Sequence, residues 1–491
     1  MSQRLSINEE FCNAPVVDER LQRRLSDFAV SAAANPGVSF PRMARSDSEL
    51  EGMYRFLSND RVRPEQILEP HLRATYGRAK EFQTVLSIED TTTLHFDHLD
   101  PKDLGYLNTG KAGFFGHFAM LMSPDGSMPL GIGSVETHFR TKAPRKRKPG
   151  KGRAPKRSGG EYAKQEHRES DRWLTTMDAV EGRLPPGVSA IHIQDREGDN
   201  YRLVAESIMK GRRFVIRLCQ RDRAALCPGQ DQAQWGRLDE LVRGGGDMTT
   251  REVPLSRRQA KTAPQANQAH PPRKGRVATL RFAATTIMLR RPRYVKESLP
   301  AFITINVVRV HEPNPPQGEE PVEWWLATTE PVDTIEQVLF VVDAYRARWT
   351  IEEFNKALKT GCGFERRNLE TRAAILNALA LFVPIAWQLL AFRDAGRAQP
   401  NAPATTVLSA RQLQVLRSLT TRPLSDLPTL REALLAVARE GGHLLRNGEP
   451  GWQTLGRGLE KLWWAEIGFE AGYRAALAQV ANDRGPAEAD Q

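Results

Sequence analysis

Two aspartates lie where short strand-like segments end. Asp90 closes the segment Thr84–Asp90, and Asp195 closes the segment Ser189–Asp195. A carboxylate at a strand end is fixed by the sheet yet open to solvent, and two or three such groups bind hard cations such as Mg²⁺ through oxygen. Two such ions about 3.5–4 Å apart stabilise the attacking and leaving oxygens of a phosphoryl transfer. Taken alone, however, either aspartate is better explained as a turn or helix cap.

A third carboxylate, Glu352, lies in the segment Thr334–Thr360, which we predict to be one long helix. At about 100° per residue, Glu352 shares about 80° of the helical wheel with four polar residues. These residues are Tyr345, Arg348, Lys356 and Lys359. Apolar residues occupy the opposite side. Geometry alone favours a solvated face with ion pairs between residues four apart.

The elements that must position these acids follow a definite order. We predict three strands, a helix, a strand, a helix, a strand and then the long helix. The strands are 84–90, 113–122, 128–138, 189–195 and 213–218, and the two intervening helices are one through Trp173 and Met177 and one over 199–209. The predicted fold class is therefore α/β, with the element order of a ribonuclease-H-like nucleotidyl-transfer core.

Helical patterns dominate both ends of the chain. Leu21, Leu25, Phe28 and Ala32 recur at helical spacing within residues 15–75. Residues 370–395, 405–418, 428–445 and 455–482 are also predicted to be mostly helical, whereas residues 230–330 mix polar loops with short strands at 302–310 and 324–328. The apolar stretch 373–392 contains Asn377, Pro384 and Gln388, so we interpret it as a buried core helix rather than a membrane span.

Composition and charge narrow the function classes. The 491 residues include 70 Lys+Arg, 59 Asp+Glu and four cysteines without a CxxC pair, which does not support a zinc or redox motif. Residues 140–157 carry ten basic residues and residues 253–296 carry eleven, and neither segment contains an acid. We expect each to be a loop, a tail or a polyanion-binding surface, which favours a nucleic-acid partner. The N-terminus lacks an apolar signal segment, so we expect a cytoplasmic protein.

The segment Tyr345–Lys359 (YRARWTIEEFNKALK) matches the pattern Y-x2-R-x3-E-x6-K. It resembles the signature of a branch of bacterial DDE transposases that move insertion sequences. The phrases SIEDTTTL around Asp90 and QDREGD around Asp195 are similar to the first and second acidic motifs of that group. The resemblance is closest to the Tn-five-type transposases and extends over most of the chain.

This resemblance implies a catalytic triad of Asp90, Asp195 and Glu352 that holds two Mg²⁺ ions, for which Mn²⁺ can substitute. Asp90 would bridge both ions. The gap of 157 residues between Asp195 and Glu352 fits the large β-rich insertion of the family, here about residues 219–333. The implied activity is cut-and-paste transposition: hydrolysis of one strand, formation of a DNA hairpin, and joining of the 3′ end to target DNA.

Further residues acquire roles only through the resemblance. Tyr345, Arg348, Lys356 and Lys359 would grip phosphates near the cleaved end, Arg217 would contact a phosphate or base, and Trp324 would stack on a flipped base. The alternative for Trp324 is a core position beside Trp325. Arg20, Arg24 and Arg55 are candidate phosphate contacts at the N-terminus.

The implied organisation has three parts: a helical DNA-end-binding domain (1–70), a ribonuclease-H-like catalytic domain (71–368), and a helical domain for dimerisation and DNA binding (369–491). The expected partners are the terminal inverted repeats, target DNA and a second copy of the chain, with no membrane. The nucleoid would be the site of action. The alternatives are a ribonuclease-H-like structure-specific nuclease, a non-catalytic DNA-binding derivative and an RNA-binding protein, although we find no RNP-like aromatic motif.

Overall fold

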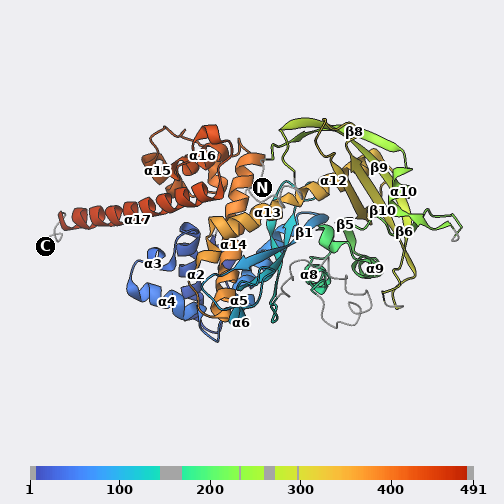
Figure 1. Ribbon diagram of the computed structural model, residues 1–491. Helices are drawn as coiled ribbons and strands as arrows, with labels where there is room; N and C mark the ends of the chain where they lie inside the picture. The colour runs from blue at the N-terminus through green and yellow to red at the C-terminus, as the bar shows by residue number, and fades with distance from the viewer. Residues whose placement is uncertain (1–6, 144–168, 232–233, 259–270, 296–297, 484–491) are drawn as a thin grey trace.

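The computed structural model describes residues 7–143, 169–231, 234–258, 271–295 and 298–483. Most of its strands join one mixed sheet of eleven strands, and helices from the two ends of the chain gather beside one end of that sheet (Figure 1). Residues 144–157 of the first basic segment lie outside the described residues, so the structure does not test their predicted role.

One half of the sheet has the strand order β3-β2-β1-β4-β5. These strands are β1 (Thr84–His95), β2 (Gly113–Met122), β3 (Pro129–His138), β4 (Ser189–Gln194) and β5 (Arg213–Arg217). The first three form an antiparallel meander, whereas β4 runs parallel to β1 and β5 runs parallel to β4. Helix α8 (Asp171–Glu181) precedes β4, and α9 (Tyr201–Met209) connects β4 to β5. The predicted order of strands and helices is confirmed.

The predicted end of the first strand is wrong. β1 continues beyond Asp90 to His95, so Asp90 lies inside the strand. Thr91, Thr92 and Thr93 remain paired with β2, with Thr91 opposite His117. Threonine is β-branched and suits an extended backbone, which explains why the strand does not stop at the acid.

The other half of the sheet continues from β5 in the order β11-β10-β9-β6-β7, with β8 paired to β9. These strands are β6 (Ala224–Leu226), β7 (Gly236–Arg237), β8 (Asp247–Leu255), β9 (Arg276–Arg290), β10 (Phe302–His311) and β11 (Glu323–Thr328), accompanied by helix α10 (Leu238–Arg243). Because β11 pairs antiparallel with β5, this β-rich region extends the first half of the sheet.

Part of the second basic segment, expected to be a loop, tail or binding surface, is strand β9. Leu280, Phe282 and Leu289 are buried in the core, Arg281 is exposed, and the side chain of Arg276 is only 15% exposed. Arg276 pairs with Glu312 and Glu319, and Arg281 pairs with Asp247. The positive charge is therefore partly neutralised by acids from distant segments, and a strand is stable there.

The N-terminal helices pack around an apolar core. They are α1 (Ile7–Phe11), α2 (Glu19–Ala34), α3 (Phe40–Met43), α4 (Asp47–Leu57) and α5 (Pro64–Ala79). Leu21, Leu25, Phe28 and Ala32 of α2 are all buried, as their spacing predicts. Asp18 begins α2 by accepting the N–H of Leu21, and Ser46 begins α4 by accepting the N–H of Glu49.

The predicted single long helix is interrupted. Helix α12 (Ile335–Ala347) ends at Arg348, α13 (Trp349–Lys356) begins directly after it, and a π-helical turn, η3 (Ala357–Gly361), follows. At Arg348 the backbone N–H bonds to the carbonyl of Tyr345, three residues back rather than four. This tighter turn separates the two helices.

Helix α14 (Arg372–Ala398) runs through the middle of the molecule between the N-terminal helices and the last helices (Figure 1). It is long and apolar enough to cross a membrane, but 89% of its most apolar window is buried inside the protein. Buried Asn377 donates to the carbonyls of Leu57 and Val62. The prediction of a core helix is confirmed.

The remaining C-terminal helices are α15 (Ala410–Leu419), α16 (Leu430–Glu440) and α17 (Trp452–Asp483). Helix α17 extends away from the body of the molecule (Figure 1). Short helical turns complete the described structure. They are α6 (Pro101–Leu104), η1 (Arg196–Gly198), η4 (Phe364–Arg366), η5 (Ala404–Thr406) and η6 (Leu445–Asn447).

Candidate active site

The parallel pairing of β1 and β4 sets Asp90 and Asp195 side by side. The paired residues run in register up to Ile88 opposite Ile193. Asp90 follows two residues later within β1, and Asp195 follows two residues later, directly after the end of β4. Asp195 also accepts the N–H of Glu197 at 2.8 Å and so begins the turn η1. Asp195 is thus also a turn residue, which is the alternative that we considered for it. Only its Oδ1 accepts this hydrogen bond, so Oδ2 does not take part in it.

Helix α13 brings Glu352 to the same place. The guanidinium of Arg348 lies 3.5 Å from Asp90 Oδ1 and 2.5 Å from Glu352 Oε1, so one cation bridges the two acids. Asn355 donates from Nδ2 to Asp90 Oδ2 at 3.1 Å. On its other side, α13 buries Phe354, whose ring meets Phe118 of β2 edge-on at 5.3 Å. Apolar packing therefore fixes which face of α13 is turned to Asp90.

The acids act on one another electrostatically. Burial, with smaller contributions from the negative charges of Asp195, Glu352 and Glu197, raises the pKa of Asp90 to about 7 against the opposing charge of Arg348. The side chain of Asp90 is only 17% exposed. An additional cation that binds beside this carboxyl group would stabilise its charged form.

The donor atoms suit a hard divalent cation. Asp195 and Glu352 are near enough to act electrostatically on Asp90, and the buried Oδ1 of Asn355 has no hydrogen-bond partner among the described residues. Oxygen ligands of this type are those that Mg²⁺ prefers. Within those residues, no three His, Cys, Asp or Glu side chains are already close enough to hold a metal ion. Arg348 supplies the positive charge between Asp90 and Glu352.

A buried network missed by the sequence reasoning lies on the opposite face of β1. Glu89 accepts from His192 Nδ1 at 2.6 Å and from Gln194 Nε2 at 2.7 Å. His192 Nε2 lies 3.1 Å from Glu181 of α8. Burial lowers the pKa of His192, but Glu89 and Glu181 outweigh it and raise that pKa to about 9. The network ties β1 to β4 one residue before each aspartate.

A second group of missed residues surrounds Asp90 on the side of η1. Arg172 of α8 donates to Thr91 Oγ1 at 2.9 Å and to Glu197 at 2.6 Å. Thr91 also bonds to His117 at 2.8 Å, and burial lowers the pKa of His117 to about 3, so this imidazole is neutral. These bonds connect β1, β2 and η1 directly beside the carboxylates. Their residues come from separate segments, and no local sequence pattern predicts them.

Three of the predicted DNA-binding residues meet between the start of β11 and the last turn of α12. The indole of Trp324 lies edge-on to Tyr345 at 5.6 Å, and the guanidinium of Arg217 lies 5.9 Å from the same indole. Trp324 is half-buried, whereas its neighbour Trp325 is fully buried. Tyr345 acts electrostatically on Arg348, as its predicted place on the polar face implies, but it is only 5% exposed and so is not open to solvent.

The two lysines of the helix signature differ. Lys356 is exposed, lies one turn after Glu352 in α13 as predicted, and pairs with Glu353 at 2.6 Å. Lys359 lies in η3, and burial lowers its pKa while Glu365 and Asp90 oppose that shift. Lys359 therefore lies on the side of Asp90, as its place on the helical wheel predicts.

Glu353, next to Glu352, faces away from the site. Its Oε2 accepts from Arg393 of α14 at 2.6 Å and from the indole N–H of Trp452 of α17 at 3.2 Å. Glu353 thus anchors α13 to two C-terminal helices. Adjacent residues on a helix point about 100° apart, so only one of the two glutamates can face Asp90. This spacing is visible in the sequence.

The three predicted N-terminal arginines lie on the surface of α2 and α4. Arg20, Arg24 and Arg55 are exposed, and Arg55 pairs with Glu51 at 2.6 Å. The structure pairs none of them with the acids of β1, β4 or α13.

Two family models match the chain. A transposase DNA-binding model matches residues 4–62, the region that contains Arg20, Arg24 and Arg55. A transposase DDE domain model matches residues 136–383, which is just over half of the chain. The second match contains Asp195 and Glu352 and begins after Asp90. A DDE domain implies a ribonuclease-H-like core, in agreement with the strand order β3-β2-β1-β4-β5.

Proposed function

The chain belongs to the DDE transposases, and on that premise we propose that it moves its element by a cut-and-paste pathway with a DNA hairpin intermediate. It is a phosphoryl-transfer enzyme with a DNA-binding region at its N-terminus. The observation that carries the proposal is the electrostatic coupling of Asp90 with Asp195 and Glu352, on three elements that the sheet and α13 hold together. We also propose that the chain resembles the Tn-five-type branch of these transposases.

In this proposal Asp90, Asp195 and Glu352 hold two divalent cations, with Mg²⁺ as the natural choice. Such ions stabilise the attacking and leaving oxygens of phosphoryl transfer. Asn355 orients Asp90 through their 3.1 Å hydrogen bond. Arg348 bridges Asp90 and Glu352 and keeps both acids aligned. Because the pKa of Asp90 is raised to about 7, a cation held there would stabilise the charged form of this carboxyl group.

We divide the work among three regions. Residues 1–70 recognise the terminal inverted repeat, residues 71–368 perform catalysis, and residues 369–491 support dimerisation and further DNA contact. Lys359 and Arg217 contact phosphates near the cleaved end, and Lys356 lies further out. The test is genetic: short inverted repeats bordered by a direct duplication should flank the gene, and flanks without such repeats would contradict a mobile-element origin.

The protruding part of α17 supports a dimer. Phe469, Tyr473 and Leu477 are spaced four residues apart and are 39%, 55% and 52% exposed. They form one apolar stripe on a helix that leaves the body of the protein (Figure 1). A stripe of this kind is suited to pack against the same stripe of a second copy. Analytical ultracentrifugation with and without end DNA measures whether two copies assemble.

Trp324 should act at the hairpin step. Stacking on an extrahelical base is worth about 1–3 kcal/mol by alanine substitution. We expect Trp324→Ala to nick the first strand at a near-normal rate and then accumulate nicked DNA, with hairpin formation slowed about 10–100-fold, equivalent to about 1.4–2.7 kcal/mol. Timed denaturing gels of both steps measure the effect.

The neighbouring residue supplies the matched control for Trp324. Trp325 is fully buried, so Trp325→Ala should lower the melting temperature and slow both steps together. If Trp324→Ala behaves in the same way, Trp324 is a core residue and its stacking role is refuted.

A further inference from the structure

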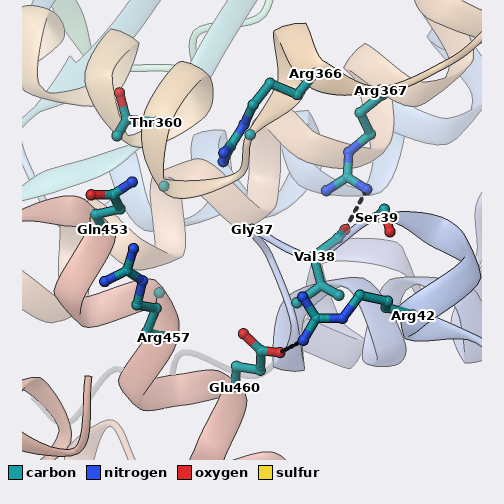
Figure 2. Close-up of a pocket in the computed structure, with 13 residues that line it drawn as sticks. Gly37, Val38, Ser39, Arg42, Thr360, Arg366, Arg367, Gln453, Arg457 and Glu460 are labelled. Carbon is teal, nitrogen blue, oxygen red and sulfur yellow. Dashed lines mark hydrogen bonds and ion pairs between the residues drawn. The ribbon is translucent and has the colours of Figure 1, made fainter. Parts of the chain in front are cut away.

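A cavity of about 320 Å³ lies where three distant parts of the chain meet (Figure 2). One wall is the connection between α2 and α3, the second is the end of η3 with η4, and the third is the first turns of α17. Thr360 and Gly361 in the second wall directly follow Lys359. The cavity therefore begins where the helix that carries Glu352 ends.

The side chains of this cavity are strongly basic. Four arginines and one acid, Glu460, line it. Arg42 pairs with Glu460 at 3.2 Å. Arg367 is buried and donates to the carbonyls of Pro36, Val38 and Cys362, so it holds the walls together.

The other two arginines, Arg366 and Arg457, are unpaired. Both are exposed, and neither has a side-chain hydrogen bond or ion pair within the described part of the chain. Figure 2 shows both guanidinium groups directed toward the same space, with the amide of Gln453 beside them. This arrangement presents two positively charged forks to one anion.

The backbone of the cavity is built for close approach. A Cβ on Gly37 would lie 3.0 Å from the carbonyl oxygen of Gly361, and a Cβ on Gly456 would lie 3.3 Å from the same atom. Gly363 has a φ of +58°, and a Cβ there would lie 2.9 Å from Arg366 Nη2. Glycine at these positions allows the three walls to meet and Arg366 to lie across the opening.

We propose that this cavity binds a phosphate group of the DNA backbone, held by Arg366 and Arg457. Guanidinium groups bind phosphate through paired N–H bonds, which is the chemistry that two free forks offer. A DNA phosphate fits better than a small metabolite, because both arginines are exposed at the mouth and the lining is mostly polar, with Val38 as its one large apolar side chain. The inference rests on the proposed function, and it assigns DNA contact to residues outside the helix signature.

Phosphate binding in this cavity would couple the positions of three parts of the chain. A phosphate in this cavity would contact the N-terminal helices, the end of the catalytic helix and α17 at once. DNA bound there would therefore hold α13, and with it Glu352, in a fixed position relative to the DNA-binding region.

The test compares two variants of the full chain by fluorescence anisotropy on a labelled duplex that carries the element end. In Arg366→Gln/Arg457→Gln we expect a Kd about 10–100-fold higher than for the wild type and a salt dependence shallower by about 0.9 in log–log slope. The matched control is Arg446→Gln, an exposed arginine of η6 outside the cavity, which should keep the wild-type slope. Melting temperatures should stay the same, because all three side chains are exposed.

Inorganic phosphate tests whether the cavity binds a phosphate of DNA or a free phosphate ion. If it raises the melting temperature of the wild type but the double variant keeps the wild-type DNA slope, the cavity binds a free anion and the DNA assignment is overturned. An equal loss in Arg446→Gln also overturns it. If the wild type cleaves end DNA and the double variant binds DNA as tightly as the wild type, the role of the cavity is refuted and the proposed function stands. If the wild type does not bind DNA, the proposed function is refuted as well.

Discussion

Asp90→Ala, Asp195→Ala and Glu352→Ala should each lower metal-dependent cleavage of the element end at least about a thousandfold, equivalent to about 4 kcal/mol of transition-state stabilisation. Each substitution removes an oxygen ligand from a set that must hold hard cations. DNA binding should stay close to the wild-type value, because the exposed arginines of α2 and α4 are untouched. Gel assays of cleavage and anisotropy measurements of binding test both halves of the prediction.

The control for these variants is the adjacent acid. Glu353→Gln should still cleave, since Glu353 faces Arg393 and Trp452 and not Asp90. A second variant tests whether lost cleavage results from unfolding. Asp90→Asn should have the melting temperature of the wild type in the absence of metal, because burial already disfavours the charged form of Asp90. A variant of any of the three acids that cleaves at the wild-type rate would refute its assignment.

His192→Gln should destabilise the protein by about 3–5 kcal/mol at neutral pH. The substitution removes a buried cation and leaves the buried Glu89 without the imidazolium that pairs with it. Because the pKa of His192 is raised from 6.5 to about 9 in the folded protein, its charge stabilises the fold fully below pH 6.5. That contribution, about 3 kcal/mol, is lost as the pH rises through about 9.

Urea unfolding from about pH 6 to about pH 10 measures this dependence. The free energy of unfolding of the wild type should fall over that range more steeply than that of His192→Gln. The control His192→Gln/Glu89→Gln should regain part of the lost stability, because it removes the unpaired charge. Identical pH profiles for the wild type and His192→Gln would show that His192 is not charged in the folded state.

Much of the core was predictable from local patterns. The alternation and apolar runs of β2, β3, β4 and β5 lie within the segments themselves, and so does the spacing of α2. Strand β9 was not predictable, because its arginines are neutralised by Glu312, Glu319 and Asp247 from elsewhere in the chain. A count of charges along one segment cannot include partners that only the fold supplies.

The same limit applies to the site. The helix signature predicts Glu352 and Arg348 on one face, and the structure pairs them. Tyr345 is buried where its ring packs against Trp324 of β11, a contact between a strand and a helix. The link between Glu89 and His192 requires knowing that β1 and β4 are in register. Each of these features is a tertiary contact with no local signal.

The most direct test of the account is strand joining. The wild-type protein is incubated with Mg²⁺, a linear DNA that ends in the repeat flanking its gene, and a supercoiled target plasmid. We predict hairpin-ended excision products followed by covalent insertion of the element's 3′ ends into the plasmid, all absent in Glu352→Ala. Cleavage without any joined product would contradict the account and identify the enzyme as a nuclease.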